Sequence, residues 1–243
     1  MARDDDLVEE MRAYYEARAP WHDEYMGYTD NESMEELLRP IVDAVGELLS
    51  GCDVLEIACG TGNWTQVLAR RCPRVVAVDA CRDPLAIARG KDYPAGRVEF
   101  LGADAYSLQG VASDFTGAFA ADWLSHVPRG RLGEFLRTLH DHLRDGAPVV
   151  FVGIAHRDHP DLTPYREDED GNLICRRTLP DGRAFDVVKN YPTEDELRCI
   201  VGDAGCAVEY RVWSELGRWL LSYQVAGRRR AQRPPEDANG GRA

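Results

Sequence analysis

The sequence predicts an α/β protein in which helices pack on both faces of one mostly parallel sheet. Five short apolar runs, each bounded by Gly, Pro or Asp, have the length and boundaries of buried strands. The stretches between them carry apolar residues at helical spacing. Strands that alternate with helices pair in parallel through crossover connections, because a tight turn can join only antiparallel neighbours.

Two helices are predicted before the first strand. Residues 4–19 place apolar side chains at helical spacing among charged neighbours, and Pro20 ends that helix. A second helix is predicted over residues 33–49, with Pro40 as a candidate kink. Residues 1–50 therefore form an N-terminal helical segment.

Strands and helices then alternate. The expected strands are residues 54–58, 75–79, 98–101, 118–121 and 149–153. The helices between them are expected at residues 64–71, 84–89 and 129–144.

After the fifth predicted strand, the regular alternation of strands and helices ends. Residues 156–172 are polar and rich in Pro and acidic side chains, which predicts an exposed loop. A hairpin is predicted from residues 173–178 and 183–189, because Pro180 and Gly182 suit the turn between them.

The last elements are a helix and two strands. Thr193 and Glu196 have the spacing of a capping box and open a helix that reaches about Ala204. Two closing strands, residues 207–213 and 219–225, complete the sheet. The tail, residues 227–243, has too few apolar residues to offset its ordering entropy and is expected to be disordered.

Composition narrows the class of protein. The 243 residues carry a formal charge of −13, which argues against a nucleic-acid partner because such binding depends on Lys and Arg neutralising phosphates. The acidic start, residues 1–6, does not resemble a signal peptide, and no apolar run is long enough to span a bilayer. The seven cysteines contain no C-x-x-C pair that would indicate a metal. We expect a cytoplasmic protein that acts on small molecules, without membrane or metal; its oligomeric state is not indicated.

A glycine-rich turn follows the first predicted strand. The sequence Cys59-Gly60-Thr61-Gly62 leads from that strand into a helix. Ligands of open α/β sheets bind outside the carboxyl ends of the strands, where glycine lets them approach the backbone. Such a turn alone is weak evidence, because dinucleotide enzymes share it.

Two later carboxylates strengthen the interpretation. Asp79 closes the second strand and can accept hydrogen bonds from ribose hydroxyls, while Asp104 follows the third strand and can accept a hydrogen bond from the adenine amino group. The alternative is that both are ordinary turn residues. The coincidence of turn and acids favours an adenosine site.

The rest of the turn distinguishes between two adenosine cofactors. A dinucleotide fingerprint needs a third glycine, but Thr65 stands at that position. Glu56 also brings a carboxylate towards the turn, where it would repel a pyrophosphate but suit a ligand with an ammonium and a sulfonium. These features favour S-adenosylmethionine (SAM) over NAD.

The sequence E-I-A-C-G-T-G, followed by V-V-A-V-D and G-A-D-A, resembles the class I SAM-dependent methyltransferases of the small-molecule, natural-product type, over residues 50–226. The resemblance implies a Rossmann-like, seven-stranded sheet whose last strand runs antiparallel. It also implies a methyltransferase domain at residues 51–226, with a loop-hairpin insertion at about 156–190, and a lid formed by residues 1–50. The first glycine of the family motif is Ala58 here.

The same resemblance implies roles for individual residues in binding SAM. Glu56, Gly60 and Gly62 are implied to line the methionine end, and Ala58 and Thr61 of the same turn are also implied to bind the cofactor. Asp79 with Ala80 would bind the ribose, and Asp104 with Ala105 the adenine.

The segment that follows the fourth strand supplies candidate catalytic residues. His126 could act as a general base, or could only pack at the start of the next helix. Asp122 could contact cofactor or substrate, or could only cap the turn. Trp123 lies between them in sequence and is a candidate for contact with the substrate.

Aromatic residues gather in the N-terminal segment. Tyr14, Tyr15, Trp21 and Tyr25 could form a lid that excludes water from the site, or could simply be helix core. The expected activity is methyl transfer to nitrogen or oxygen of a small molecule. A regulatory protein that binds SAM without turnover, and an NAD-dependent oxidoreductase, are the competing hypotheses.

Overall fold

The computed structural model describes residues 2–28, 31–155 and 164–227. Its main sheet contains β1 (Asp53–Ile57), β2 (Arg74–Asp79), β3 (Val98–Gly102), β4 (Gly117–Ala121), β5 (Pro148–Ile154), β9 (Gly205–Trp213) and β10 (Arg218–Val225). The helices are α1 (Ala2–Arg18), α2 (His22–Tyr25), α3 (Asn31–Leu37), α4 (Arg39–Leu49), α5 (Asn63–Arg71), α6 (Arg82–Arg89), α7 (Leu132–Asp141) and α8 (Glu194–Val201).

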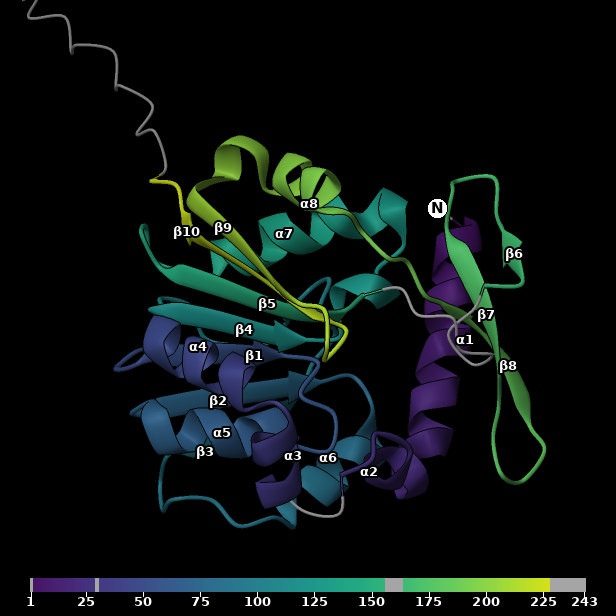
Figure 1. Cartoon of the computed structure of the whole chain (residues 1–243), viewed down its shortest axis with the longest axis horizontal. Helices are drawn as coiled ribbons and strands as arrows, with labels where there is room; N and C mark the ends of the chain where they lie inside the picture. The colour runs from purple at the N-terminus through teal and green to yellow at the C-terminus, as the bar shows by residue number, and fades with distance from the viewer. Residues whose placement is uncertain (1, 29–30, 156–163, 228–243) are drawn as a thin grey trace, which may run out of the picture.

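The strand order of the main sheet is β3-β2-β1-β4-β5-β10-β9. The first five strands pair in parallel, and β10 runs antiparallel to both β5 and β9. The predicted Rossmann-like sheet, with its antiparallel last strand, is confirmed (Figure 1). The strand order changes direction at β1 and β4, which is where open α/β sheets bind their ligands.

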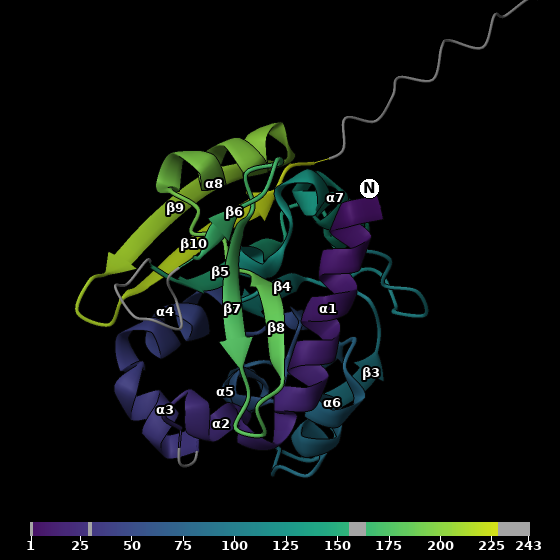
Figure 2. The same ribbon diagram turned by 90° about the vertical axis from the view of Figure 1, so that its right-hand side faces the viewer.

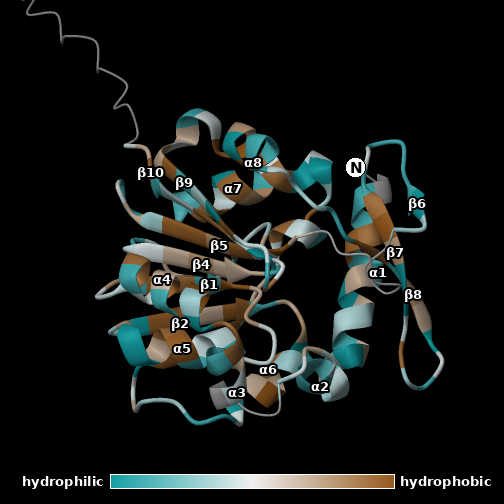
Figure 3. Cartoon of the chain, viewed as in Figure 1, coloured by the Kyte–Doolittle hydropathy of each residue, from teal (hydrophilic) through white to brown (hydrophobic). Residues whose placement is uncertain are grey.

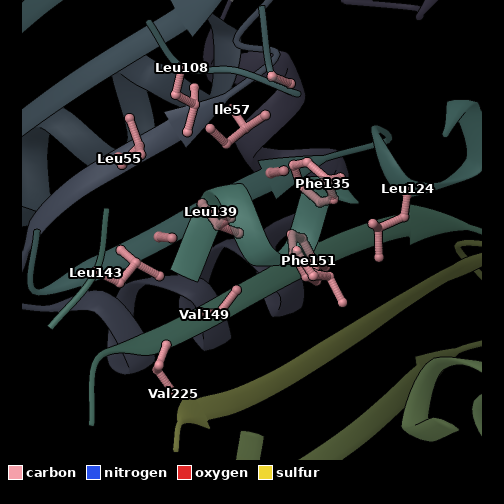
Figure 4. Packing of buried hydrophobic residues seen from close by; sticks show 14 of the residues in the cluster. Leu55, Ile57, Leu108, Leu124, Phe135, Leu139, Leu143, Val149, Phe151 and Val225 are labelled. Carbon is pink, nitrogen blue, oxygen red and sulfur yellow. The ribbon is translucent and has the colours of Figure 1, made fainter. Parts of the chain in front are cut away.

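Helices cover both faces of the sheet because successive side chains of a strand point to opposite faces. On β1, Leu55 and Ile57 belong to the core under α7 and α8, whereas Val54 belongs to the core under α4 and α5. Figure 4 shows Phe135 and Leu139 of α7 pointing towards Phe151 and Val149 of β5. The hydrophobic residues of the sheet lie mainly on its central strands (Figure 3).

A second, three-stranded sheet stands beyond the carboxyl ends of the parallel strands. It consists of β6 (Arg166–Glu167), β7 (Leu173–Thr178) and β8 (Ala184–Val188), all antiparallel. Helix α1 lies alongside β8, and Figure 2 shows α1 and the hairpin side by side in front of the main sheet. Met11 and Tyr14 of α1 share a small hydrophobic core with Ile174 and Val187 of the hairpin.

Most predicted elements are confirmed within one or two residues, including the hairpin and the Thr193 capping box. The predicted helix over residues 33–49 is wrong as one element, because it breaks at Leu38 and Pro40 occupies the first turn of α4. The predicted loop 156–172 is also partly wrong, since β6 pairs with Leu173 and Ile174. The predicted tail, apart from Gly227, lies outside the described residues.

Candidate active site

The predicted motif residues surround one cavity of about 240 Å³ at the carboxyl ends of the parallel strands. Among the residues predicted for the site, those that line it are Tyr15, Tyr25, Glu56, Ala58, Gly60, Thr61, Asp79, Ala80, Asp104, Ala105, Asp122, Trp123 and His126. The strand ends, the N-terminal helices and the hairpin all contribute to its wall. The sheet therefore brings the turn after β1 together with the carboxylates after β2 and β3.

Three predicted residues do not line the cavity. Tyr14 is buried against the hairpin, with its ring 5.7 Å from that of Phe185. Trp21 ends the short 3-10 turn between α1 and α2. Gly62 is the N-cap of α5 with φ of +82°, and a Cβ there would collide with the hydroxyl of Tyr93. Tyr14 and Gly62 thus shape the site from behind its wall.

The glycine turn is held by Asp79. The backbone N–H of Gly60 and that of Cys81 each donate a 2.8 Å hydrogen bond to this carboxylate. Burial raises the pKa of Asp79, and these two bonds oppose that effect. Asp79 keeps further lone pairs for the hydroxyls of a ribose, because a carboxylate can accept about four hydrogen bonds.

Ala58 and Asp122 have backbone conformations that residues other than glycine rarely adopt. Their φ angles are +52° and +58°, in the left-handed region. Ala58 therefore takes the conformation for which the related motif uses glycine. Such conformations cost about 1–2 kcal/mol and persist where the surrounding structure imposes them, often at functional sites.

Glu56 is buried with one carboxylate oxygen that has no hydrogen-bond partner among the described residues. It lies on the face of β1 that turns towards α5, beside Val54 in the strand alternation. Burial raises the pKa of Glu56 to about 8. An unpartnered buried carboxylate on the cavity wall suits a ligand that carries an ammonium group.

The N-terminal segment is tied to the glycine turn by residues that the motif analysis missed. Asp23 of α2 accepts hydrogen bonds from Thr61 (2.6 Å) and Asn63 (2.8 Å), and it forms a 2.8 Å ion pair with Lys91. On the other side, Arg12 of α1 donates to the carbonyl of Ala80. Polar contacts therefore hold the N-terminal segment against the motif itself.

His126 is buried and its ring is oriented by two hydrogen bonds. Its Nδ1 lies 2.7 Å from the carbonyl of Val188, so Nδ1 carries the proton and Nε2 is the acceptor. The hydroxyl of Tyr15 donates to Nε2 over 2.7 Å. Burial and the neighbouring Lys189 lower the pKa of His126 well below its usual range, which keeps the ring neutral.

Asp122 and Lys189 stand beside His126. Asp122 accepts a 2.6 Å hydrogen bond from Arg218, and its carbonyl accepts one from Ser125. Lys189 donates to Ser125 over 2.9 Å, and its Nζ lies 3.5 Å from Nε2 of His126. Burial lowers the pKa of Lys189 to about 8.

Two cationic residues of the site, Lys189 and Arg177, come from the hairpin region, and Lys189 was not predicted from the sequence. Both line the cavity. They belong to the hairpin and the residue that follows it, so only the folded hairpin brings them there.

No group of three or more His, Cys, Asp or Glu side chains suited to a metal occurs in the described ranges. In the same ranges no helix is long and apolar enough to cross a membrane.

Comparisons with known proteins indicate the family of the chain. A family model for a methyltransferase domain matches residues 54–146. A 2-phytyl-1,4-naphtoquinone methyltransferase from Thermosynechococcus vestitus is 39% identical over 172 residues, which cover 65% of this chain and 74% of that protein. The O-methyltransferase cnsE from Penicillium expansum is 31% identical over 147 residues, which cover 56% of this chain and 52% of that protein. The chain thus spans about half the length of the Penicillium relative.

A solved structure of DhpI in complex with SAH is similar over 91% of this chain and 98% of that chain, with a TM-score of 0.71 and 28% identity. The chain belongs to the class I SAM-dependent methyltransferases. SAM is therefore its cofactor, and Glu56, Asp79 and Asp104 fit the chemistry of its ammonium, ribose and adenine.

Proposed function

We propose that the chain transfers the methyl group of SAM to an oxygen or nitrogen atom of a small molecule. The observation that carries this proposal is that the cofactor motif and His126 line the same cavity. Bound SAM supplies an electrophilic methyl group on its sulfonium. The protein then has to hold a nucleophile in line with that group and to exclude water.

His126 is the proposed catalytic residue. The bond from Nδ1 to Val188 fixes the ring, so Nε2 can accept a hydrogen bond from a hydroxyl or amine of the acceptor. In this structure the hydroxyl of Tyr15 donates a hydrogen bond to Nε2. The methyl acceptor would either displace that hydroxyl or hydrogen-bond to Nε2 through it. Asp122 acts as a positioning residue, because it anchors Arg218 and, through its carbonyl, Ser125.

Residues 1–50 serve as the lid of a methyltransferase domain at residues 51–226. The contacts of Asp23 with Thr61 and of Arg12 with Ala80 support this role, since they hold the helices against the cofactor motif. Tyr15, Tyr25 and Trp123 provide the aromatic wall on the acceptor side, because each lines the cavity. The name of one relative, an O-methyltransferase, supports oxygen as the acceptor atom.

The test is incubation of the protein with SAM that carries a deuterated methyl group and with the small-molecule fraction of a bacterial extract. We expect S-adenosylhomocysteine (SAH) together with a deuterated metabolite. The variant His126→Asn keeps a donor for Val188 but lacks Nε2, and should lose at least about tenfold in rate. His142→Asn, outside the cavity, is the matched control. Absence of SAH with every fraction would instead support a regulatory protein that binds SAM without turnover.

A further inference from the structure

We infer that the methyl acceptor is a small anion whose carboxylate or tetrahedral oxyanion group is held by Arg18, Arg177 and Lys189. This inference rests on the proposed function and names the class of its substrate. All three side chains line the cavity, and each is more than nine-tenths buried. They come from α1, β7 and the residue that follows β8.

None of the three cations forms an ion pair with a carboxylate within the described parts of the chain. Two nitrogens of Arg18, Nε and Nη2, have no hydrogen-bond partner there at all. Asp122, an acid on the same wall, is already paired with Arg218 at 2.6 Å. Burying unpaired charge is costly, and such groups are retained mainly where a ligand completes them.

Contacts through Tyr25, Tyr15 and His126 link the three cations around one part of the wall. The guanidinium of Arg18 lies 4.1 Å from the ring centre of Tyr25, and the hydroxyl of that tyrosine accepts a 2.9 Å hydrogen bond from Arg177. Arg18 also faces the ring of Tyr15, whose hydroxyl reaches His126 and so the neighbourhood of Lys189. The cations are therefore arranged to face one ligand.

The cofactor alone does not account for this charge. SAM brings one carboxylate, which neutralises one positive charge, and it adds an ammonium and a sulfonium to the same cavity. At least two buried cations are then left for the acceptor. An oxyanion suits them, because guanidinium groups bind planar or tetrahedral oxyanions through paired hydrogen bonds and Lys adds a point charge.

An anion would also improve His126 as a hydrogen-bond acceptor and base. Lys189, Arg177 and Arg18 all oppose protonation of its ring. An oxyanion paired with these cations weakens their effect on the pKa of His126. The bound acceptor would therefore make His126 a better base for the acceptor's own proton. The substrate class and the proposed role of His126 thus support each other.

The test uses the SAH-saturated protein and measures its melting temperature during titration with three probes: malonate, methylphosphonate and the uncharged malonamide, at constant ionic strength. We expect saturable stabilisation by at least one anion and none by malonamide. The preference between malonate and methylphosphonate distinguishes a carboxylate from a tetrahedral oxyanion. Arg177→Gln and Lys189→Gln should each weaken the anion's apparent affinity at least about tenfold.

Arg176→Gln is the matched control, because Arg176 is the neighbouring residue on β7 but is exposed and paired with Asp186. It should bind the anion as the wild type does. Equal affinity in all variants, or stabilisation by malonamide, would overturn the inference. Calorimetry with SAH alone separates the two proposals: loss of SAH binding would contradict the cofactor site, whereas normal SAH binding without anion binding would contradict only this inference.

Discussion

Replacing Glu56 by Gln should stabilise the protein without cofactor at high pH and weaken its affinity for the cofactor. Burial raises the pKa of Glu56 from 4.5 to about 8 in the folded state. Because the folded state holds this proton more tightly than the unfolded state, ionisation opposes folding as pH rises above 4.5. Ionisation of Glu56 lowers the free energy of unfolding by about 4 kcal/mol at pH 8, since each pKa unit corresponds to about 1.36 kcal/mol.

The neutral amide introduced by Glu56→Gln removes that penalty and keeps the shape of the side chain. Urea unfolding without cofactor should therefore show a gain for this variant that is about 4 kcal/mol at pH 8 and about 1 kcal/mol or less at pH 5. Calorimetry at pH 8 should show SAH bound about 10- to 100-fold more weakly, because a charge-assisted hydrogen bond to the ammonium is lost. A stability change that is the same at both pH values, or unchanged SAH affinity, would refute this account of Glu56.

Three further predictions concern the turn, the lid and the cation cluster. Gly62→Ala should lower the free energy of unfolding by about 2 kcal/mol or more, because φ is positive and the new Cβ meets Tyr93. Adding Tyr93→Phe to this variant should restore part of the lost stability. Gly102→Ala is the control, because the space around Gly102 is open. Asp23→Asn should speed amide exchange of α2 relative to the wild type, since the pair with Lys91 is lost; unchanged exchange would argue against the lid contacts. Affinity for the anionic probe should be constant below pH 8 and fall about tenfold per unit above it, because Lys189, with a pKa of about 8, must be protonated to bind. The groups that face Lys189 are Asp122, Arg177, Arg218, Cys175 and His126; a slope that persists in Lys189→Gln would point to one of them instead.

The secondary-structure elements were predicted well where a local sequence motif marks their ends. The capping box at Thr193 and the turn at Pro180 to Gly182 are confirmed because each depends on neighbouring residues. The break at Leu38 was missed because Pro is tolerated in the first turn of a helix, so Pro40 begins α4 and does not merely kink it. Strand β6 was missed because two residues leave no periodic pattern.

The cofactor half of the site could be predicted from the sequence, whereas Lys189 in the acceptor half could not. Glu56, Asp79 and Asp104 lie on or after strands whose parallel order fixes their place at one edge of the sheet. Arg177 and Lys189 reach the cavity only because the hairpin stands across that edge, which no local pattern encodes. One signal was present: Lys91 and Lys189 are the only lysines in the chain, Lys189 lines the cavity, and Lys91 binds Asp23 and Asn63 next to the glycine turn.

The most direct test of the account is calorimetric titration of SAH into the wild type and into Asp79→Ala, with Asp83→Ala as control. Asp79 holds the glycine turn and faces the cavity, whereas Asp83 is exposed in the first turn of α6. We expect one site per chain in the wild type and in the control. Binding to Asp79→Ala should be at least about 100-fold weaker, because two backbone donors and the ribose lose their acceptor. Equal affinity in all three proteins would contradict the assignment of the cofactor site.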